Sequence, residues 1–388
     1  MATKVETSVA LSIDRNALAR AMSHLARVVE RRNTIPILSN VRLSPGDQYL
    51  TLTATDLDIE ARVDVVCETT GSGDITVPAG TFNDIVRKMA EGTAVTLAWD
   101  GTGTTVTVRA GRSRFSLQAL PASDFPDLAA GDMPHRFTLP AATLLALIEA
   151  TAFAISTEET RYYLNGIYLH CPATPEGENH TALRGVATDG HRLACFDAPT
   201  PVGAEGMPGI IIPRKTVGEI ARLAKDAMDK NGNGEVEVAL SAAKIRVSAA
   251  GVTLTSKLID GTFPDYQRVI PRNNTKRATL ALEAFARAAD RVATISSERG
   301  RAVKLSFDEG KLRLSVSNPD AGSAEEEIEA EYAEAAIDIG FNSRYLADIL
   351  AALDGDTVLV KLGDPGSPTV FQKSEGDHLL IVLMPMRA

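Results

Sequence analysis

Hydrophobic residues follow two different periods along the chain, and each period predicts one kind of element. Short runs in which apolar and polar residues alternate, bounded by Gly, Asp and Asn, predict β-strands joined by hairpins. Longer runs with apolar residues three or four positions apart predict amphipathic helices, each directly after a strand. The pattern gives two sets of strand-to-helix segments, residues 77–89, 212–224 and 339–353, and residues 11–29, 137–155 and 280–295.

These segments recur at a spacing of about 130 residues, which predicts three copies of one structural unit. A third set of aligned segments agrees, because in each a β-rich run meets a polar turn and a further run follows: residues 52–63, 185–196 and 314–327. We therefore predict three domains, residues 1–131, 132–272 and 273–388. Each is expected to be of the α+β class, with two helices on antiparallel sheets.

The aligned turns separate what the fold requires from what it does not. Asp189, within GVATDGHRLACFDAP (185–199), aligns with Asp56 in the first copy and Asn318 in the third. Asp and Asn favour turns because their side chains accept hydrogen bonds from nearby backbone amides, so Asp189 is predicted to build a turn. His191 and Arg192 have no counterpart in the first copy. We assign them to a task that only the middle domain performs.

Several function classes have little support in the sequence. The net charge is −10, and no signal-peptide pattern or bilayer-length apolar run is present. The three cysteines form no CxxC pair, so we expect a cytoplasmic protein without a structural metal. Asp189 and His191 lack an accompanying GxSxG motif, which leaves a hydrolase as a minor alternative. Residues 101–105 lack the lysine of a phosphate loop and are predicted to be a hairpin turn.

Four short segments are more specific: RYYLNG (161–166), ATDGHRL (187–193), FPDYQRVIP (263–271) and VLMPMR (382–387). They closely resemble the DNA polymerase III beta subunit family, the bacterial sliding clamps, and the resemblance extends in order along the whole chain. It implies an accessory protein without catalysis or a cofactor. Two such chains would close head to tail into a ring of six domains around duplex DNA, which is held without regard to sequence.

The resemblance also implies a pocket between the middle and last domains. Clamp loaders, replicative and translesion polymerases, mismatch-repair proteins and ligase would insert short apolar motifs of the form Gln-Leu-x-Leu-Phe there. His191 and Arg192 would face the partner, and Arg192 and Arg268 would supply hydrogen-bond donors. The alternative is a non-replicative clamp paralogue with few partners or a small molecule in the pocket. The assigned pocket residues are Leu164, Thr188, Gly190, His191, Arg192, Leu193, Pro264, Arg268, Val269, Asn342, Tyr345, Gly366, Pro368, Val382, Leu383, Met384, Pro385, Met386 and Arg387.

A basic stripe on the first helix predicts where DNA would lie. Arg20, His24, Arg27 and Arg31 recur at spacings that place them on one face, opposite an apolar core face. Taken alone, such a stripe is most often a solvated surface. The middle domain's second helix opens with Arg214 and Lys215. Positive charges at a helix N-terminus interact unfavourably with the helix dipole, and a nearby polyanion would offset this cost. With the resemblance included, the predicted DNA contacts are Arg20, Arg27, Arg32, Tyr162, Tyr163, Arg214 and Lys215.

Ring closure is predicted at two places. The resemblance pairs Phe115 and Leu117 of one chain with Thr294 and Ile295 of the next. Residues 111–120 alternate apolar and polar side chains as an edge strand does. A head-to-tail edge pairing of this kind closes a homodimer into a ring.

Overall fold

The computed structural model describes residues 8–30, 34–100, 104–128, 131–172, 182–296 and 302–387. The chain forms two compact units, one of Met1–Leu139 with Arg222–Lys257 and one of Pro140–Ala221 with Leu258–Ala388. The predicted middle domain therefore contributes residues to both units. Its boundaries at 131/132 and 272/273 stay predictions.

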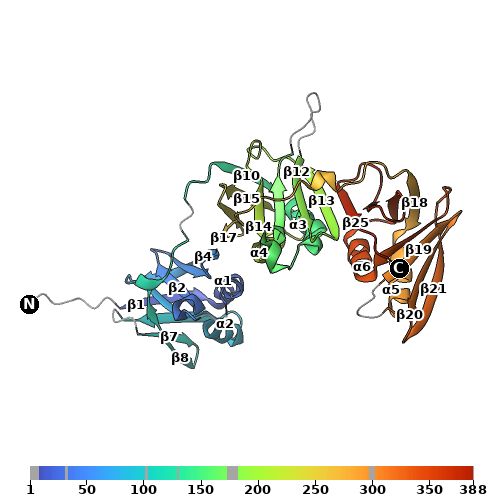
Figure 1. Cartoon of the computed structure of the whole chain (residues 1–388). Helices are drawn as coiled ribbons and strands as arrows, with labels where there is room; N and C mark the ends of the chain where they lie inside the picture. The colour runs from blue at the N-terminus through green and yellow to red at the C-terminus, as the bar shows by residue number, and fades with distance from the viewer. Residues whose placement is uncertain are drawn as a thin grey trace, which may run out of the picture. The chain divides into compact units, whose positions relative to one another are not determined.

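The first unit is organised by one sheet of thirteen strands in the order β10-β15-β16-β17-β4-β1-β6-β7-β8, with β2, β3, β5 and β9 paired beside this path. Figure 1 labels β1, β2, β4, β7 and β8 in the blue and teal part of the chain. β17 pairs antiparallel with β4, so the sheet continues from the first repeat into the second. The strands are β1 (Val9–Asp14), β2 (Asn40–Pro45), β3 (Tyr49–Thr55), β4 (Ile59–Thr70), β5 (Ile75–Pro78), β6 (Ala94–Trp99), β7 (Thr105–Ala110), β8 (Ser113–Gln118), β9 (Leu120–Pro121), β10 (His135–Pro140), β15 (Glu235–Leu240), β16 (Lys244–Ala249) and β17 (Val252–Lys257).

The second unit contains a sheet of eight strands, β14-β11-β12-β13-β25-β24-β23-β18, and a sheet of four, β21-β20-β19-β22. β13 pairs antiparallel with β25, which joins the second repeat to the third. The strands are β11 (Gly166–His170), β12 (Ala182–Thr188), β13 (Arg192–Pro199), β14 (Ile210–Pro213), β18 (Lys276–Ala281), β19 (Ala302–Asp308), β20 (Lys311–Asn318), β21 (Gly322–Glu329), β22 (Ile337–Asn342), β23 (Thr357–Leu362), β24 (Thr369–Gln372) and β25 (Leu379–Leu383).

Six α-helices in the described residues confirm the predicted strand-to-helix segments, because each begins directly after a strand. They are α1 (Arg15–Val28), α2 (Ala79–Lys88), α3 (Ala141–Thr151), α4 (Arg214–Ala227), α5 (Leu282–Ala293) and α6 (Ser343–Ala352). α1 contacts α2 in the first repeat, and α5 contacts α6 in the third. Their apolar faces are buried, with Met22, Phe82 and Phe285 fully enclosed.

The three aligned turns have closely related hydrogen bonds, as the repeat predicts. Asp189 Oδ1 accepts from the backbone N–H groups of His191 and Arg192. Asp56 Oδ1 accepts in the same way from the residues two and three positions further on. Asn318 Oδ1 accepts from Asp320 N in the third repeat. One acceptor therefore organises the turn in all three copies, and the residues after it can differ.

Candidate functional site

The turn of residues 188–192 is fixed from both of its sides. Gly190 has a φ of +90°. A Cβ there would lie 2.6 Å from Arg161 Nη1, so glycine suits both the backbone and the close approach. Arg161 Nη2 donates to the Asp189 carbonyl, and its Nε donates to Glu158, whose pKa is lowered by this bond. The RYYLNG segment thus holds the turn in place.

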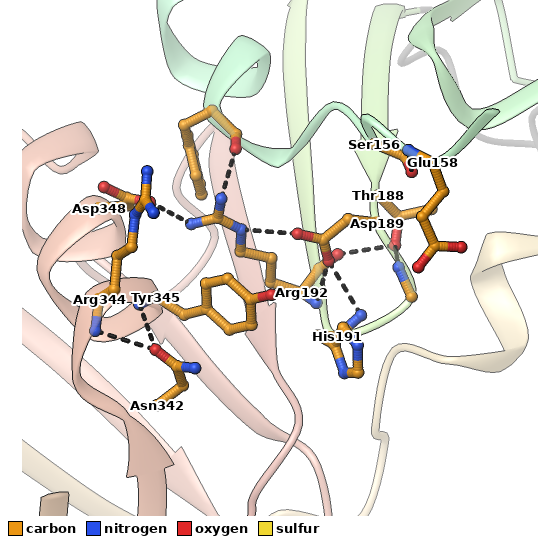
Figure 2. A network of polar contacts seen from close by, with 12 residues as sticks. Ser156, Glu158, Thr188, Asp189, His191, Arg192, Asn342, Arg344, Tyr345 and Asp348 are labelled. Carbon is orange, nitrogen blue, oxygen red and sulfur yellow. Dashed lines mark hydrogen bonds and ion pairs between the residues drawn. The ribbon is translucent and has the colours of Figure 1, made fainter. Parts of the chain in front are cut away.

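Arg192 differs from the expectation that it faces a partner. Its side chain is only 9% exposed. Nε donates to Asp189 Oδ2 at 3.1 Å, Nη1 to Asp348 Oδ2 at 2.6 Å and Nη2 to the Phe153 carbonyl at 2.7 Å (Figure 2). The prediction that Arg192 faces a partner is wrong because a buried guanidinium requires acceptors, and three lie within reach inside the protein.

His191 is exposed and stands beside the last residues of the chain. Its ring stacks on Tyr345 with centroids 5.9 Å apart and planes at 27°. Its carbonyl accepts from Met384 N at 2.9 Å, which ties the end of β25 to the turn. Backbone amides donate to Asp189 Oδ1, and Arg192 Nε donates to Asp189 Oδ2. A catalytic Asp–His pair is therefore not formed in this turn.

The C-terminal segment divides into a buried and an exposed part. Val382 and Leu383 are buried core residues of β25, whereas Met384 and Met386 are each 37% exposed. Met386 N donates to the Gly340 carbonyl at 2.9 Å, so the exposed part is anchored to β22. Val382 and Leu383 were expected to line the pocket, but their side chains face the core.

Beside this segment is a cavity of about 430 Å³. Four of the predicted pocket residues line it: Gly366, Pro385, Met386 and Arg387. It also contains Lys304 and Asp338, which form an ion pair at 2.8 Å and which the sequence did not single out.

Several other predicted pocket residues share one apolar cluster. Leu164, Leu193 and Val382 are buried together with Phe263 and Tyr266. These two aromatic residues anchor the segment that carries Pro264, Arg268 and Val269, which are exposed. Arg268 pairs with Asp265 at 2.8 Å, with its side chain 85% exposed. Arg268 is thus accessible as a donor, in contrast to Arg192.

A polar network beneath this cluster was not predicted. Arg184 donates two bonds to the Asp197 carboxylate, at 2.5 and 2.6 Å, and one from Nη1 to the Tyr266 hydroxyl at 3.2 Å. The hydroxyl lies 3.1 Å from His170 Nε2. Because the hydroxyl accepts from Arg184, its own proton is available to a neutral imidazole. Arg184 and Asp197 lie opposite each other on the paired strands β12 and β13. The sequence did not predict their interaction because a single pair of charged residues changes no hydrophobic period.

The pH dependence of stability tests this network. Burial, with a smaller effect of Arg184, lowers the pKa of His170 from the ordinary 6.5 to about 4. Between these values the unfolded chain binds the extra proton, so stability should fall as the pH drops from about 6.5 to 4. We expect a decrease of about 1–2 kcal/mol after allowing for partial exposure. Urea unfolding of the wild type and His170→Gln at pH 7 and 4.5 measures it, and equal pH dependence in both proteins would contradict the assignment.

Family models match three consecutive parts of the chain. They describe the N-terminal domain of the DNA polymerase III beta subunit over residues 9–129, the central domain over 138–265 and the C-terminal domain over 267–387. The chain belongs to this family. Beta sliding clamps from Caulobacter vibrioides and Escherichia coli are 46% and 38% identical to it, each covering 97% of this chain and 99% of the relative.

Solved structures agree with this membership. A Bartonella birtlesii sliding clamp bound to griselimycin has a TM-score of 0.92 and 45% identity. A sliding clamp from Caulobacter crescentus has a TM-score of 0.91 and 46% identity. Both alignments cover 98% of this chain and all of the other. The predicted fold and family are therefore confirmed.

The predicted DNA contacts of this family member lie on both units, and their role stays a prediction. Arg20 and Arg27 are exposed on α1 in the first unit. In the second unit Tyr162 is 54% exposed, with its ring edge-on to Tyr163, and Arg214 and Lys215 are exposed. Arg31 and Arg32 lie outside the described residues.

His24 is a correction to the predicted basic stripe. Its side chain is buried and lies 3.6 Å from Asp226 Oδ2. The spacing in α1 is right, but Asp226, a residue of the second repeat that belongs to the first unit, lies beside the His24 ring. The stripe is thereby reduced to its arginines.

Each of the two predicted ring edges has an exposed residue. β8 ends its sheet, and its Phe115 is 39% exposed beside a cavity of about 510 Å³. Leu117, on the same strand, is a correction, because its side chain is buried in the core. In the second unit Thr294 is exposed and Ile295 half-buried at the end of α5. None of the helices in the described ranges is long and apolar enough to span a membrane.

Proposed function

We propose that the chain is a cytoplasmic, non-catalytic sliding clamp that closes as a homodimer around duplex DNA and tethers DNA-processing proteins. The observation that carries the proposal is the anchored C-terminal segment, in which exposed Met384 and Met386 are held beside exposed His191 by the Met384 N–His191 O bond. Methionines are flexible and polarisable, which suits a surface that receives several apolar motifs. The clamp loader, polymerases, mismatch-repair proteins and ligase are the proposed partners.

DNA binding is proposed to depend on diffuse phosphate contacts. The chain is acidic overall, with 40 basic and 50 acidic residues, yet Arg20 and Arg27 are exposed on one face of α1. Contacts of basic side chains with phosphates carry no sequence information, which is what a sliding protein requires. Tyr162 adds an exposed aromatic side chain that is suited to stacking or sugar contacts.

Retention on DNA of defined topology tests the proposal. A closed ring, once loaded, should remain on nicked circular DNA during gel filtration and should dissociate when the circle is linearised. Equal retention on both forms would indicate ordinary surface binding. Equal dissociation from both would indicate that no ring closes around DNA.

Salt dependence gives a second prediction. Reversing Arg20 and Arg27 to Glu should reduce the slope of log Kobs against log salt by up to about one unit for each phosphate that is no longer neutralised. The matched control is Arg62→Glu with Lys257→Glu, an equal charge change on β4 and β17 instead of α1. Fluorescence anisotropy with a labelled duplex measures both slopes. An unchanged slope in the α1 variant would mean that these arginines only solvate the helix.

A further inference from the structure

We propose that Arg192 and Asp348 act together as positioning residues, which set the distance between the His191 turn and helix α6 before a partner binds. This inference rests on the proposed partner pocket and deepens it. It assigns a role to Asp348, and it changes the role of Arg192 from a donor to the partner into an internal support.

The contacts of Arg192 join three segments within the second unit. Its guanidinium bonds to Asp189 in the turn, to the carbonyl of Phe153 at the 3-10 segment Ala152–Ala154, and to Asp348 on α6. The guanidinium carbon also lies 4.4 Å from the ring centroid of Tyr345 and 5.2 Å from that of Phe153. Figure 2 shows Arg192 between the Asp189 turn and the helix that carries Tyr345 and Asp348.

Both sides of the proposed binding surface depend on these contacts. On one side, His191 follows the Asp189–Gly190 pair and holds Met384 through its carbonyl. On the other, Asn342 caps α6 by accepting from Arg344 N and Tyr345 N, and Tyr345 presents its ring to His191. Arg192 bonds to both the turn and α6. Its bond to Asp348 therefore helps to set the separation of His191 and Tyr345, together with the Met384–His191 and Met386–Gly340 backbone bonds.

The burial of Arg192 makes this support sensitive to Asp348. A cation that is 9% exposed needs its paired acceptors, and Asp348 supplies an ionic partner from α6. Neutralising Asp348 weakens the restraint between turn and helix without removing any exposed side chain of the turn. The binding-competent separation is then populated for a smaller fraction of the time, and apparent affinity falls by that fraction.

Peptide-binding kinetics test the inference. We expect Asp348→Asn to weaken binding of a labelled Gln-Leu-Ala-Leu-Phe peptide about tenfold, mainly through a lower association rate. Removal of a group that touches the peptide would instead raise the dissociation rate. The control is Glu375→Gln, which removes an ion pair to Lys361 in the same unit and should leave both rates unchanged.

A double-mutant cycle provides the deciding measurement. If Asp348 acts through Arg192, Asp348→Asn should have no further effect on peptide affinity in an Arg192→Gln protein, where the cation that pairs with Asp348 is already removed. Wild-type affinity in Asp348→Asn, or additive effects of the two changes, would overturn the inference while leaving the pocket intact. Failure of the wild-type protein to bind the peptide would overturn the proposed pocket itself, and the inference with it.

Discussion

Replacing Ile295 by Asp should convert the protein into monomers at micromolar concentration. Ile295 is half-buried at the end of α5. In the proposed ring, a second chain would complete its burial. A carboxylate enclosed there without a partner costs on the order of several kcal/mol. Phe115→Asp should have the same effect at the β8 edge, where the aromatic ring is 39% exposed. Sedimentation velocity measures the mass, and Val66→Asp, at an 82% exposed apolar residue outside both edges, is the control.

Mixing the two variants distinguishes a head-to-tail ring from other dimers. In a head-to-tail pair, one interface joins two altered surfaces and the other joins two intact surfaces. The mixture should therefore form dimers at concentrations where each variant alone is monomeric, although one interface lacks the gain from closing the ring. An isologous dimer made from β8 alone would leave Ile295→Asp dimeric and would show no such complementation.

The repeat was predictable because local chemistry was enough to define it. Apolar spacing marked each helix, and the preceding strand ended at each helix start, as β5 and α2 illustrate. Asp56, Asp189 and Asn318 were recognisable as turn residues because their acceptors act over two or three positions. Hydrogen bonds between residues so close in the chain can be predicted from the sequence alone.

The side-chain environment of the site was less predictable because it depends on distant partners. Arg192 pairs with Asp348, 156 positions away, and no periodicity connects them. His24 has the spacing of a solvent-facing residue and is nevertheless buried beside Asp226, a residue of another repeat. Leu117 sits on an edge strand but packs inward. A helical or strand pattern identifies faces, whereas residues distant in the sequence, of the same repeat or of another, decide which faces are covered.

Removing residues 384–388 should abolish most peptide binding without disturbing the fold. Leu383 is fully buried and pairs with both β13 and β24, so the truncation must begin after it. Met384 and Met386 lie beyond this strand and are exposed. Binding energy at such surfaces concentrates in a few apolar anchors, so binding should weaken by about 2 kcal/mol or more, roughly a 30-fold higher Kd.

His191→Ala is the matching change on the other side of the surface. It removes the ring that stacks on Tyr345 but keeps the backbone carbonyl that binds Met384 N, so the β25 end should stay in place. Changing Arg192 at the same time would mix the effect of the missing His191 ring with that of a weakened internal support, because the guanidinium is buried. Calorimetry with Gln-Leu-Ala-Leu-Phe measures both proteins, and Val202→Ser, at a 91% exposed apolar residue on a loop, is the control. If both variants bind as the wild type does and remain dimeric on DNA, partners must attach to a different surface of the clamp.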